Sequence, residues 1–345
     1  MQIKQLSERF AKKKSSSAVG LDIGNSSVKV VQLNSCAGTR ELAHFDVQAY
    51  KSRQRRDIVA SIKKAMETAG IDSQIVNTSV AGQAVIVRYI QMPRMTKEEL
   101  SKALKLGVGK YIPFNLDEVN YDFQILDDFS ASAPGKTMRV LLVAVKKEVI
   151  EERIKILKEA NLTPAVIDVD AFASVNSFHL VSQGSSGVIA VLDIGADITS
   201  TTILRDIVPI FNRDVPLGGN NLTKALIEEF EINAEEADRL KHNPKDKYGD
   251  LINAVRPVFD SLAKELQRSF NYCESQLGAM VQKVFLTGGT AKFKGVDKVL
   301  SSILGIDVEI WDPTLKLQIN ESLEKERLKE TGPILTVAVG LALRG

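Results

Sequence analysis

The sequence predicts an α/β fold of two related lobes, because a strand-and-turn pattern recurs along its whole length. Three glycine-containing turns each follow a short apolar or β-branched run: Leu21-Asp22-Ile23-Gly24-Asn25-Ser26, Leu192-Asp193-Ile194-Gly195-Ala196-Asp197 and Phe285-Leu286-Thr287-Gly288-Gly289-Thr290. Each is typical of a strand that enters a tight turn, where backbone N–H groups are available to an anion. Together the three turns indicate a nucleotide held between two domains.

The first two turns belong to an internal repeat. Residues 19–31 and 188–204 each contain an apolar strand, the sequence Asp-Ile-Gly, a small polar stretch and a second strand. Such a hairpin places one aspartate at the end of a strand, and two facing copies supply two carboxylates to one hydrated Mg²⁺. Asp22 and Asp193 are therefore the predicted magnesium residues, acting through water.

A common hairpin turn is the alternative interpretation of either Asp-x-Gly motif taken alone. Two further features favour a phosphate site. Lys29 follows the first aspartate in the second strand of its hairpin, and the Gly-Gly-Thr turn stands in the last third of the chain. This order is the one that a duplicated phosphate-binding fold requires.

Composition indicates a protein of about two domains that does not bind nucleic acid. The 345 residues include 45 Lys and Arg against 43 Asp and Glu, so no global field attracts a polyanion. Two cysteines and three histidines are scattered, which gives no support to a zinc site or a histidine-based nucleophile. The chemistry must then come from carboxylates and backbone amides.

The hydropathy pattern predicts a cytoplasmic chain. No segment approaches about eighteen uninterrupted apolar residues, and the basic start, residues 1–17, lacks the apolar core of a signal peptide. Ile3, Leu6 and Phe10 fall at helical spacing in this start, which is compatible with contact to anionic lipid. A solvated terminus is the simpler interpretation.

Apolar periodicity places helices and strands between the turns. Thr96 is the expected N-cap of one helix, and the Met92-Pro93 pair is expected to end the strand before it. Residues from about 85 to 160 are predicted to form a small α+β unit inserted into the first domain. The other expected elements are helices over 57–70, 147–160, 222–230 and 254–277, and strands over 76–80, 84–90, 140–145 and 165–169.

Several longer motifs stand in a fixed order along the chain. They are Gly20-Leu21-Asp22-Ile23-Gly24 with Ser26-Ser27-Val28-Lys29, Tyr111-Ile112-Pro113-Phe114, Leu116-Asp117-Glu118-Val119, Arg205-Asp206-Ile207-Val208-Pro209, Arg213-Asp214-Val215-Pro216, Gly218-Gly219-Asn220-Asn221-Leu222-Thr223 and Val337-Ala338-Val339-Gly340-Leu341-Ala342-Leu343-Arg344. In this order they resemble the PilM family, the actin-like proteins of the type IV pilus inner-membrane platform. The resemblance covers nearly the whole chain from about residue 18.

This resemblance implies an actin-like ATPase fold, with duplicated ribonuclease-H-like lobes and a small inserted α+β subdomain. The expected parts are 1–17 for the basic segment, 18–84 with 161–187 and 332–345 for the first lobe, 85–160 for the inserted subdomain, 188–220 with 281–331 for the second lobe, and 221–280 for a helical subdomain.

Proteins of this class bind Mg-ATP between their lobes, so ATP and Mg²⁺ are the implied cofactors. Backbone amides of the turns and one ammonium group are expected to hold the phosphates. Lys224 either approaches the ribose or base, or is a surface lysine on an exposed helix face. The implied ATP-binding residues are Gly24, Asn25, Ser26, Ser27, Lys29, Gly195, Ala196, Asp197, Gly218, Gly219, Asn220, Lys224, Gly288, Gly289 and Thr290.

Asp170 and Asp193 are the implied catalytic residues. Asp170 lies in the segment that supplies the water-orienting group in actin-like ATPases. Asp168 is the runner-up, and a plain helix N-cap is the alternative role for either residue. Asp197 departs from the usual phosphate turn, because a carboxylate there repels the anion unless Mg²⁺ or a lysine lies close. Slow ATPase activity is therefore expected.

The resemblance further implies an adaptor at the cytoplasmic face of the inner membrane. Its expected partner is the N-terminal tail of PilN, held in a groove between the first lobe and the inserted subdomain, and nucleotide-dependent lobe closure would change that groove. Other pilus platform proteins and motor ATPases are further implied partners. Contact with the membrane is expected to be peripheral, and the expected readout is pilus assembly, twitching motility or DNA uptake. Self-association stays open.

Two other classes share the duplicated hairpin. A metabolic kinase of the acetate-kinase or sugar-kinase type needs an acceptor pocket with a general base, and the sequence offers no convincing one. The division protein FtsA, or another filament-forming actin relative, is the second. FtsA continues into an amphipathic membrane-targeting helix, and none follows Gly345, which favours the pilus interpretation. Sedimentation with Mg-ATP separates a filament former from an adaptor.

Overall fold

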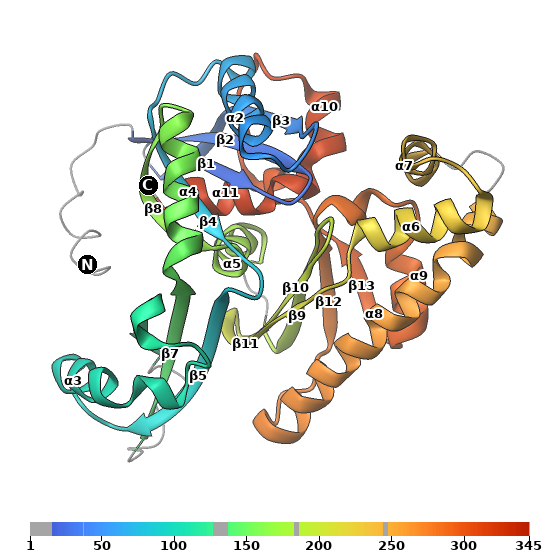
Figure 1. Ribbon diagram of the computed structural model, residues 1–345. Helices are drawn as coiled ribbons and strands as arrows, with labels where there is room; N and C mark the ends of the chain where they lie inside the picture. Colours follow the sequence, from blue (N-terminus) through green and yellow to red (C-terminus); the bar gives the residue numbers. More distant parts are fainter. Residues whose placement is uncertain (1–15, 37, 127–136, 183–185, 244–247, 345) are drawn as a thin grey trace. The chain divides into compact units, whose positions relative to one another are not determined.

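The computed structural model describes residues 16–36, 38–126, 137–182, 186–243 and 248–344 (Figure 1). Contacts divide the chain into two compact units. Unit 1 contains Met1–Ser79, Ile156–Gln183 and Trp311–Gly345, and unit 2 contains Val80–Lys155 and Gly184–Ile310. The basic segment expected at the start lies almost wholly outside the described residues. Within the described residues, no helix has the length and apolar character needed to cross a membrane.

Unit 1 is built on a six-stranded sheet with the order β14-β3-β2-β1-β4-β8. The first three strands form an antiparallel meander, whereas β4 is parallel to β1. Val28 and Val30 of β2 are buried in one core, and Val31 and Leu33 in another, so the run of β-branched residues serves both faces of the sheet. The strands are β1 (Ser16–Ile23), β2 (Ser27–Cys36), β3 (Thr39–Ala49), β4 (Ile75–Val80), β8 (Thr163–Val169) and β14 (Gln318–Ile319).

Helices cover the faces of this sheet. One helix ends at Gly70, whose φ of 67° is left-handed, as expected of a glycine C-cap. Its buried Val59 and Ile62 share a core with Ile156 and Leu157 of the helix that leads into β8. The helices of unit 1 are α2 (Arg55–Ala69), α4 (Lys147–Glu159, which begins in unit 2), α5 (Asp170–Val181), α10 (Lys325–Thr331) and α11 (Thr336–Ala342).

The last helix of the chain lies directly on the backbone of the first strand (Figure 1). A Cβ atom added at Gly20 of β1 would lie 2.6 Å from the backbone nitrogen of Ala342 in α11. One added at Gly340 would overlap the backbone of Ala173 in α5. The buried Asn77 side-chain amide donates a hydrogen bond to a backbone carbonyl of α11, at 3.0 Å. Two glycines thus set how closely β1, α11 and α5 pack.

Unit 2 contains a five-stranded sheet with the order β11-β10-β9-β12-β13. Strands β9 to β11 form an antiparallel meander, and β12 is parallel to β9. The long helix α8 turns Leu251, Val255, Phe259, Leu262 and Leu266 into the core, a helical spacing. The elements are β9 (Val188–Ile194), β10 (Thr199–Arg205), β11 (Val208–Val215), β12 (Lys283–Thr287), β13 (Asp307–Ile310), α6 (Gly219–Phe230), α7 (Ala234–His242), α8 (Tyr248–Leu277) and α9 (Val296–Leu304).

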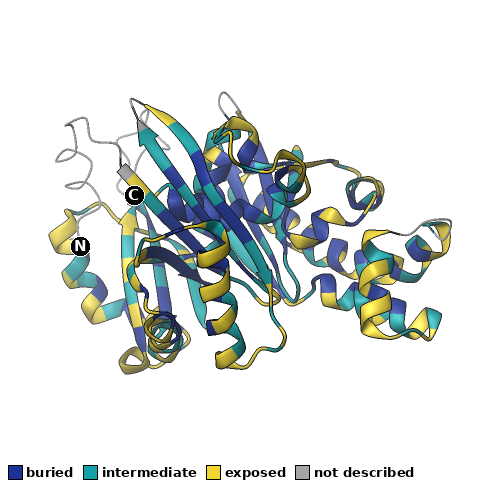
Figure 2. Cartoon of the chain, turned by 90° about the horizontal axis from the view of Figure 1, so that it is seen from above, coloured by how far each residue is buried: buried dark blue, intermediate teal, exposed yellow. Residues whose placement is uncertain are grey.

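The same unit contains a separate three-stranded antiparallel sheet with the order β5-β7-β6. Its helix begins at Thr96, where the predicted cap is confirmed: Thr96 and Glu99 form a capping box. Leu104 on this helix packs against Leu142 in a core of its own. Figure 2 shows that buried residues follow the strands, while exposed residues line the outer helix faces. The elements are β5 (Val85–Pro93), α3 (Lys97–Gly107), η1 (Val108–Lys110), η2 (Leu116–Glu118), β6 (Val119–Ile125) and β7 (Thr137–Lys146).

Met92 and Pro93 are the last two residues of the strand, as expected, although the strand runs three residues beyond the predicted range 84–90. β5 continues through both residues, which pair with Met138 and Thr137 of β7. β5 is an edge strand, and Pro93 is its last residue. At that place the N–H group that proline lacks is not needed by a second neighbouring strand.

The five-part division of the chain stays a prediction. The three-stranded sheet occupies most of the expected inserted subdomain, 85–160, and its contacts group it with unit 2. The end of α4 behaves differently, because Ile156 and Leu157 are buried in the core of unit 1.

We expect Gly340→Ala to lower the melting temperature, because the added methyl group would overlap the backbone of Ala173. Overpacking costs about 1–3 kcal/mol, and a backbone cannot rotate away as a side chain does. Gly107→Ala is the matched control, since a Cβ there meets no atom within 4 Å and alanine favours helix. Differential scanning calorimetry compares the two variants. Equal melting temperatures would contradict the close packing of α11 on α5.

Candidate functional site

The first predicted phosphate turn joins β1 to β2 in unit 1. Antiparallel pairing sets Asp22 directly opposite Lys29, and Lys29 Nζ lies 3.0 Å from Asp22 Oδ2. The side chain of Asp22 is only 7% exposed and that of Lys29 only 14%. The turn is closed by a hydrogen bond from Gly24 N–H to the Ser27 carbonyl, at 3.1 Å. The structure therefore brings the predicted magnesium carboxylate and the predicted phosphate lysine together as an ion pair.

Tyr50 holds the carbonyl side of this turn. Its backbone N–H donates to the Ser26 carbonyl, and its hydroxyl donates to the Gly24 carbonyl, both at 3.1 Å. A Cβ at Gly24 would lie 2.8 Å from Lys29 Nζ, so glycine lets the ammonium group lie beside the turn. Asn25 and Ser26 are exposed at its tip. The sequence analysis missed Tyr50, because it stands at the end of β3 without a motif around it.

The second predicted phosphate turn joins β9 to β10 in unit 2. Its backbone closes in the same way, with Gly195 N–H donating to the Ile198 carbonyl at 2.9 Å. Asp193 stands directly opposite Ser200, which occupies the position that Lys29 has in the first hairpin. One hairpin thus pairs its aspartate with a cation and the other with a hydroxyl.

The start of α6 lies against this second turn. Gly219 N–H donates to the Gly195 carbonyl at 2.9 Å, and Asn220 N–H donates to the Ala196 carbonyl at 2.7 Å. A Cβ at Gly218 would lie 2.6 Å from the Gly195 oxygen, which explains the glycine. These helix N-terminal amides therefore hold the hairpin in place, whereas the sequence had suggested that they face the nucleotide.

The third predicted turn passes the carboxylate of Asp193. Gly288 has a φ of 90°, and a Cβ there would collide with that carboxylate and lie 2.7 Å from the Ile194 carbonyl oxygen. Thr290 is buried and its hydroxyl donates to the Gly195 carbonyl at 3.4 Å, whereas Gly289 is exposed. Glycine at 288 thus lets the third turn close on the second.

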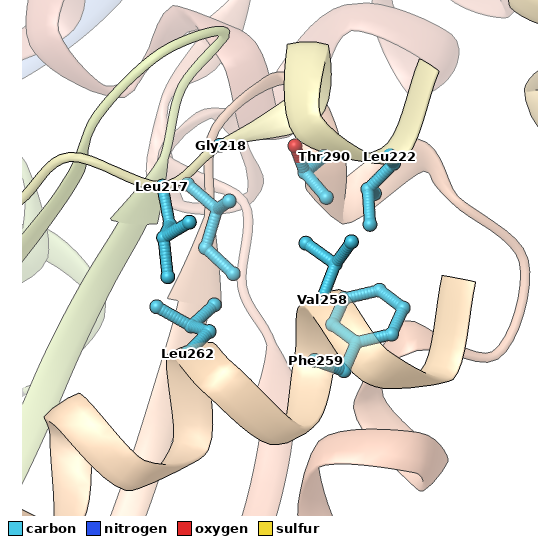
Figure 3. A pocket seen from close by; sticks show the side chains of 8 residues that line it. Leu217, Gly218, Leu222, Val258, Phe259, Leu262 and Thr290 are labelled. Atoms are coloured by element: carbon cyan, nitrogen blue, oxygen red, sulfur yellow. The ribbon is translucent and has the colours of Figure 1, made fainter. Parts of the chain in front are cut away.

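A small cavity of about 10 Å³ lies under these turns (Figure 3). Space of that size holds about one water molecule. The cavity is therefore too small for a nucleobase in this conformation, although Gly218 and Thr290 at its rim belong to the predicted site. Its lining is otherwise apolar and comes from the start of α6, from α8 and from the end of β9. The residues are Ile194, Leu217, Gly218, Leu222, Val258, Phe259, Leu262 and Thr290.

Two side chains that were predicted to bind ATP make contacts with nearby side chains of unit 2. Lys224 is exposed on α6 and lies 3.8 Å from Glu228 one turn further, the geometry of a surface pair. Asp197 accepts a hydrogen bond from the Asn220 side chain at 2.6 Å. That hydrogen bond stabilises the Asp197 carboxylate beside the turn. The negative charge of this carboxylate is the one that the sequence analysis noted as unfavourable for a phosphate.

The two candidates for orienting water, Asp170 and Asp168, lie at the junction of β8 and α5 in unit 1. Asp170 is the first residue of α5, where a carboxylate is favourable to the helix dipole. Asp168 accepts from Arg344 Nε at 2.7 Å and from the Val169 N–H at 2.9 Å. Burial raises the pKa of the Asp168 carboxyl, and the Arg344 charge opposes that rise. The Asp168 carboxylate therefore binds Arg344 and holds the segment after α11 against β8.

A metal ion at the second hairpin would depend on few protein ligands. Among the described residues, no group of three or more His, Cys, Asp or Glu side chains is arranged to hold a metal. Mg²⁺ in phosphate sites keeps several waters and takes one or two carboxylates together with phosphate oxygens. Asp193, set against the Gly288 turn, fits that limited role.

Two polar residues that the sequence analysis did not single out share a face of the sheet with Asp193. Ser200 pairs with Asp193 on one side and with Asp214 on the other, so the three side chains share one face of the sheet. Burial raises the pKa of the Asp214 carboxyl, while hydrogen bonds from Ser200 and Gly82 oppose the rise. In the sequence, Asp214 stands out only as part of the motif Arg213-Asp214-Val215-Pro216. Asp214 and Asp193 are far apart in the chain, so the sequence does not indicate that Ser200 brings them into one row across the sheet.

A sheet that begins with an Asp-Ile-Gly hairpin in each of two units defines an actin-like ATPase fold. The ethanolamine utilization protein EutJ from Carboxydothermus hydrogenoformans shares this fold, with a TM-score of 0.58 and 15% identity over 96% of this chain and 91% of that chain. Cell division protein FtsA of Enterococcus hirae is 22% identical over an alignment that spans 86% of this chain and 78% of that protein.

The particular family follows from two closer matches. The family model "Type IV pilus assembly protein PilM" matches residues 20–345. A chain of a solved PilM–PilN type IV pilus biogenesis complex is 30% identical, with a TM-score of 0.85 over 96% of this chain and 99% of that chain. The protein belongs to the PilM family, which confirms the resemblance and the fold class predicted from the sequence.

Arg344→Ala is expected to destabilise the protein in a pH-dependent way. Without the guanidinium, Asp168 keeps its buried carboxylate and loses its counter-charge, at a cost of about 1–3 kcal/mol near pH 7.5. A carboxyl whose pKa is raised in the folded state binds more protons folded than unfolded, so the cost shrinks as the pH falls and Asp168 becomes protonated.

Urea unfolding at pH 7.5 and pH 5 measures this difference. Arg55→Ala is the control, because the Arg55–Glu159 pair in the same unit is about half exposed and should contribute little at either pH. A destabilisation by Arg344→Ala that is the same at both pH values would contradict the assigned role of Asp168.

Proposed function

We propose that this chain is a nucleotide-binding adaptor of type IV pilus assembly that binds the N-terminal tail of a PilN-like protein. The observation that carries the proposal is the match to the PilM chain of a PilM–PilN complex, which extends over 96% of this chain at a TM-score of 0.85. Agreement in fold over this length supports a similar set of elements in the two proteins. We place the adaptor at the cytoplasmic face of the inner membrane, where that tail would be found.

A tail of this kind is bound as an extended peptide through backbone hydrogen bonds and apolar anchors. The three-stranded sheet β5-β7-β6 offers an edge of this type, because β5 and β6 each pair with β7 on one side only. Its own core gives this sheet the rigidity that a peptide-binding edge needs. We assign to it the partner-binding role that the resemblance gave to the inserted subdomain.

ATP is the ligand that we propose for these hairpins. Each unit carries a glycine turn beside an aspartate, with Gly24 near Asp22 in unit 1 and Gly288 near Asp193 in unit 2. Bound Mg²⁺ supplies charge neutralisation of the phosphate oxygens. Asp193 would hold that ion through water, and Lys29 would exchange its pair with Asp22 for a phosphate. Asp170 is the proposed water-orienting residue for slow hydrolysis.

The structure favours ATP as a conformational ligand more than as a substrate of fast turnover. Asp168, the alternative water-orienting residue, is already paired with Arg344, and Lys29 must leave Asp22 before it can hold a phosphate. A ligand that changes the balance of two conformations needs only differential affinity for them. The adaptor would then report nucleotide state to its partner.

The first expected outcome is saturable binding of a synthetic PilN N-terminal tail to the purified chain, with a dissociation constant that changes about fivefold or more when Mg-ATP is added. Isothermal titration calorimetry with and without Mg-ATP measures both constants. A scrambled tail of the same composition is the control. Failure of the tail to bind in either state would remove the adaptor function.

Asp193→Ala is expected to weaken Mg-ATP binding roughly 10–100-fold, the range found when an outer partner of a metal is removed. The matched control is Asp307→Ala, because Asp307 is exposed on β13 and pairs with Lys283 away from the turns. Calorimetric titration with Mg-ATP gives the affinities, and circular dichroism checks the fold. Unchanged affinity in the folded Asp193 variant would refute the assigned magnesium residue.

A further inference from the structure

A row of three polar side chains crosses the sheet of unit 2. Asp193 of β9 is directly opposite Ser200 of β10, and Ser200 is directly opposite Asp214 of β11. Residues opposite one another in antiparallel strands project from the same face, so the three side chains stand side by side. The row begins at the proposed magnesium residue and ends at the edge strand of the sheet.

Asp214 at the far end of this row binds a different part of the chain. Its Oδ2 accepts a hydrogen bond from the backbone N–H of Gly82 at 3.2 Å, and the Ser200 hydroxyl donates to the same carboxylate. Gly82 lies in the short turn between β4 and β5. The Asp214 carboxylate thus joins the five-stranded sheet of unit 2 to the segment that leads into the three-stranded sheet.

Ile198 lies near the same turn. Gly82 is buried with a φ of 89°, and a Cβ added there would lie 3.4 Å from Ile198 Cδ1. Ile198 is the residue whose carbonyl closes the Gly195 turn, at 2.9 Å. The Gly82 turn therefore lies close to the proposed phosphate turn at Ile198, and it is bonded to the aspartate row through Asp214.

The Gly82 turn is also bonded to Val85, the first residue of β5. The Gly82 carbonyl accepts a hydrogen bond from Val85 N–H at 2.9 Å, and the Ala84 carbonyl accepts from Lys146 N–H of β7 at 3.1 Å. Val85 is also the first residue of β5 to pair with β7. A displacement of the turn is thereby passed to the strand pair as a whole, since hydrogen-bonded strands move together.

We propose that Asp214 is a positioning residue that couples the nucleotide turn to the three-stranded sheet through Gly82. The inference rests on the proposed function, and it names the residues through which nucleotide state would change binding of the partner tail. When Mg-ATP orders the Asp193 and Gly195 region, Ile198 and Asp214 shift the Gly82 turn and with it β5. Asp214 itself touches neither ligand.

Coupling of this kind is measured as a ratio. The ratio of the tail's dissociation constants without and with Mg-ATP gives the linkage between the two sites. Asp214→Ala removes the acceptor for Gly82 and is expected to bring the ratio close to one, while the affinity for each ligand alone stays within about threefold. Asp214→Asn keeps an oxygen acceptor at the same place and is expected to retain most of the linkage.

A purely structural anchor would behave differently. If Asp214 only stabilised the fold, Asp214→Ala would lower the melting temperature and leave the ratio at its wild-type value, which would overturn the proposal. Asp307→Ala on the far edge strand of the same sheet serves as control and should keep the wild-type ratio. Ser200→Ala gives a milder break of the row, and an intermediate ratio is expected.

Hydrogen exchange in the unchanged chain tests the proposal without any variant. Mg-ATP should change the exchange rate of the amides of Gly82 and Val85, and unchanged exchange at both in a chain that binds Mg-ATP would overturn the coupling.

The wild-type titrations separate the two levels of inference. A wild-type chain that binds the tail and Mg-ATP independently, with a ratio of one, would overturn the coupling and leave the adaptor function standing. A wild-type chain that binds neither would overturn the proposed function and this inference with it.

Discussion

Antiparallel register at the ends of two hairpins is the constraint on which the rest of the site depends. In each hairpin an aspartate closes the first strand, a glycine turn follows, and the residue opposite the aspartate is fixed by the pairing. That opposite residue is Lys29 in one hairpin and Ser200 in the other. The same backbone therefore sets the aspartate opposite a cationic side chain in unit 1 and opposite a hydroxyl-bearing side chain in unit 2.

Close backbone packing keeps these hairpins in place. In unit 1, Gly20 and Gly340 let α11 lie on β1 and α5 without side chains between them. In unit 2, Gly218 and Gly288 bring the start of α6 and the third turn onto the carbonyls of the second hairpin. Contacts between backbones leave little freedom for adjustment, since there is no side chain to change rotamer. These contacts consequently fix the two hairpins against the elements that pack on them.

In the region predicted to bind nucleotide, backbone amides serve contacts within unit 2. The helix N-terminal amides of Gly219 and Asn220 are used to hold the hairpin, and the cavity beneath them has room for about one water molecule. An adaptor needs a ligand-sensitive connection to its partner more than a fast catalytic group. The hydrogen bond from Gly82 to Asp214 joins the segment before β5 to the five-stranded sheet, and it is the connection that we propose for this role.

The sequence by itself determined the strands, the turns, the capped helix at Thr96 and the family, because these depend on local patterns of apolar, glycine and capping residues. It also marked Asp193, Gly195 and Gly288, whose residue types are demanded by tight turns. Only the tertiary structure decided the partners of these residues. Lys29 forms an ion pair with Asp22, the Asn220 side chain donates a hydrogen bond to Asp197, and Asp214 accepts one from Gly82. Strand register and packing between segments set these contacts. Asp214 and Gly82 are far apart in the chain, and the pairing of Lys29 with Asp22 depends on strand register, so a local pattern records neither contact.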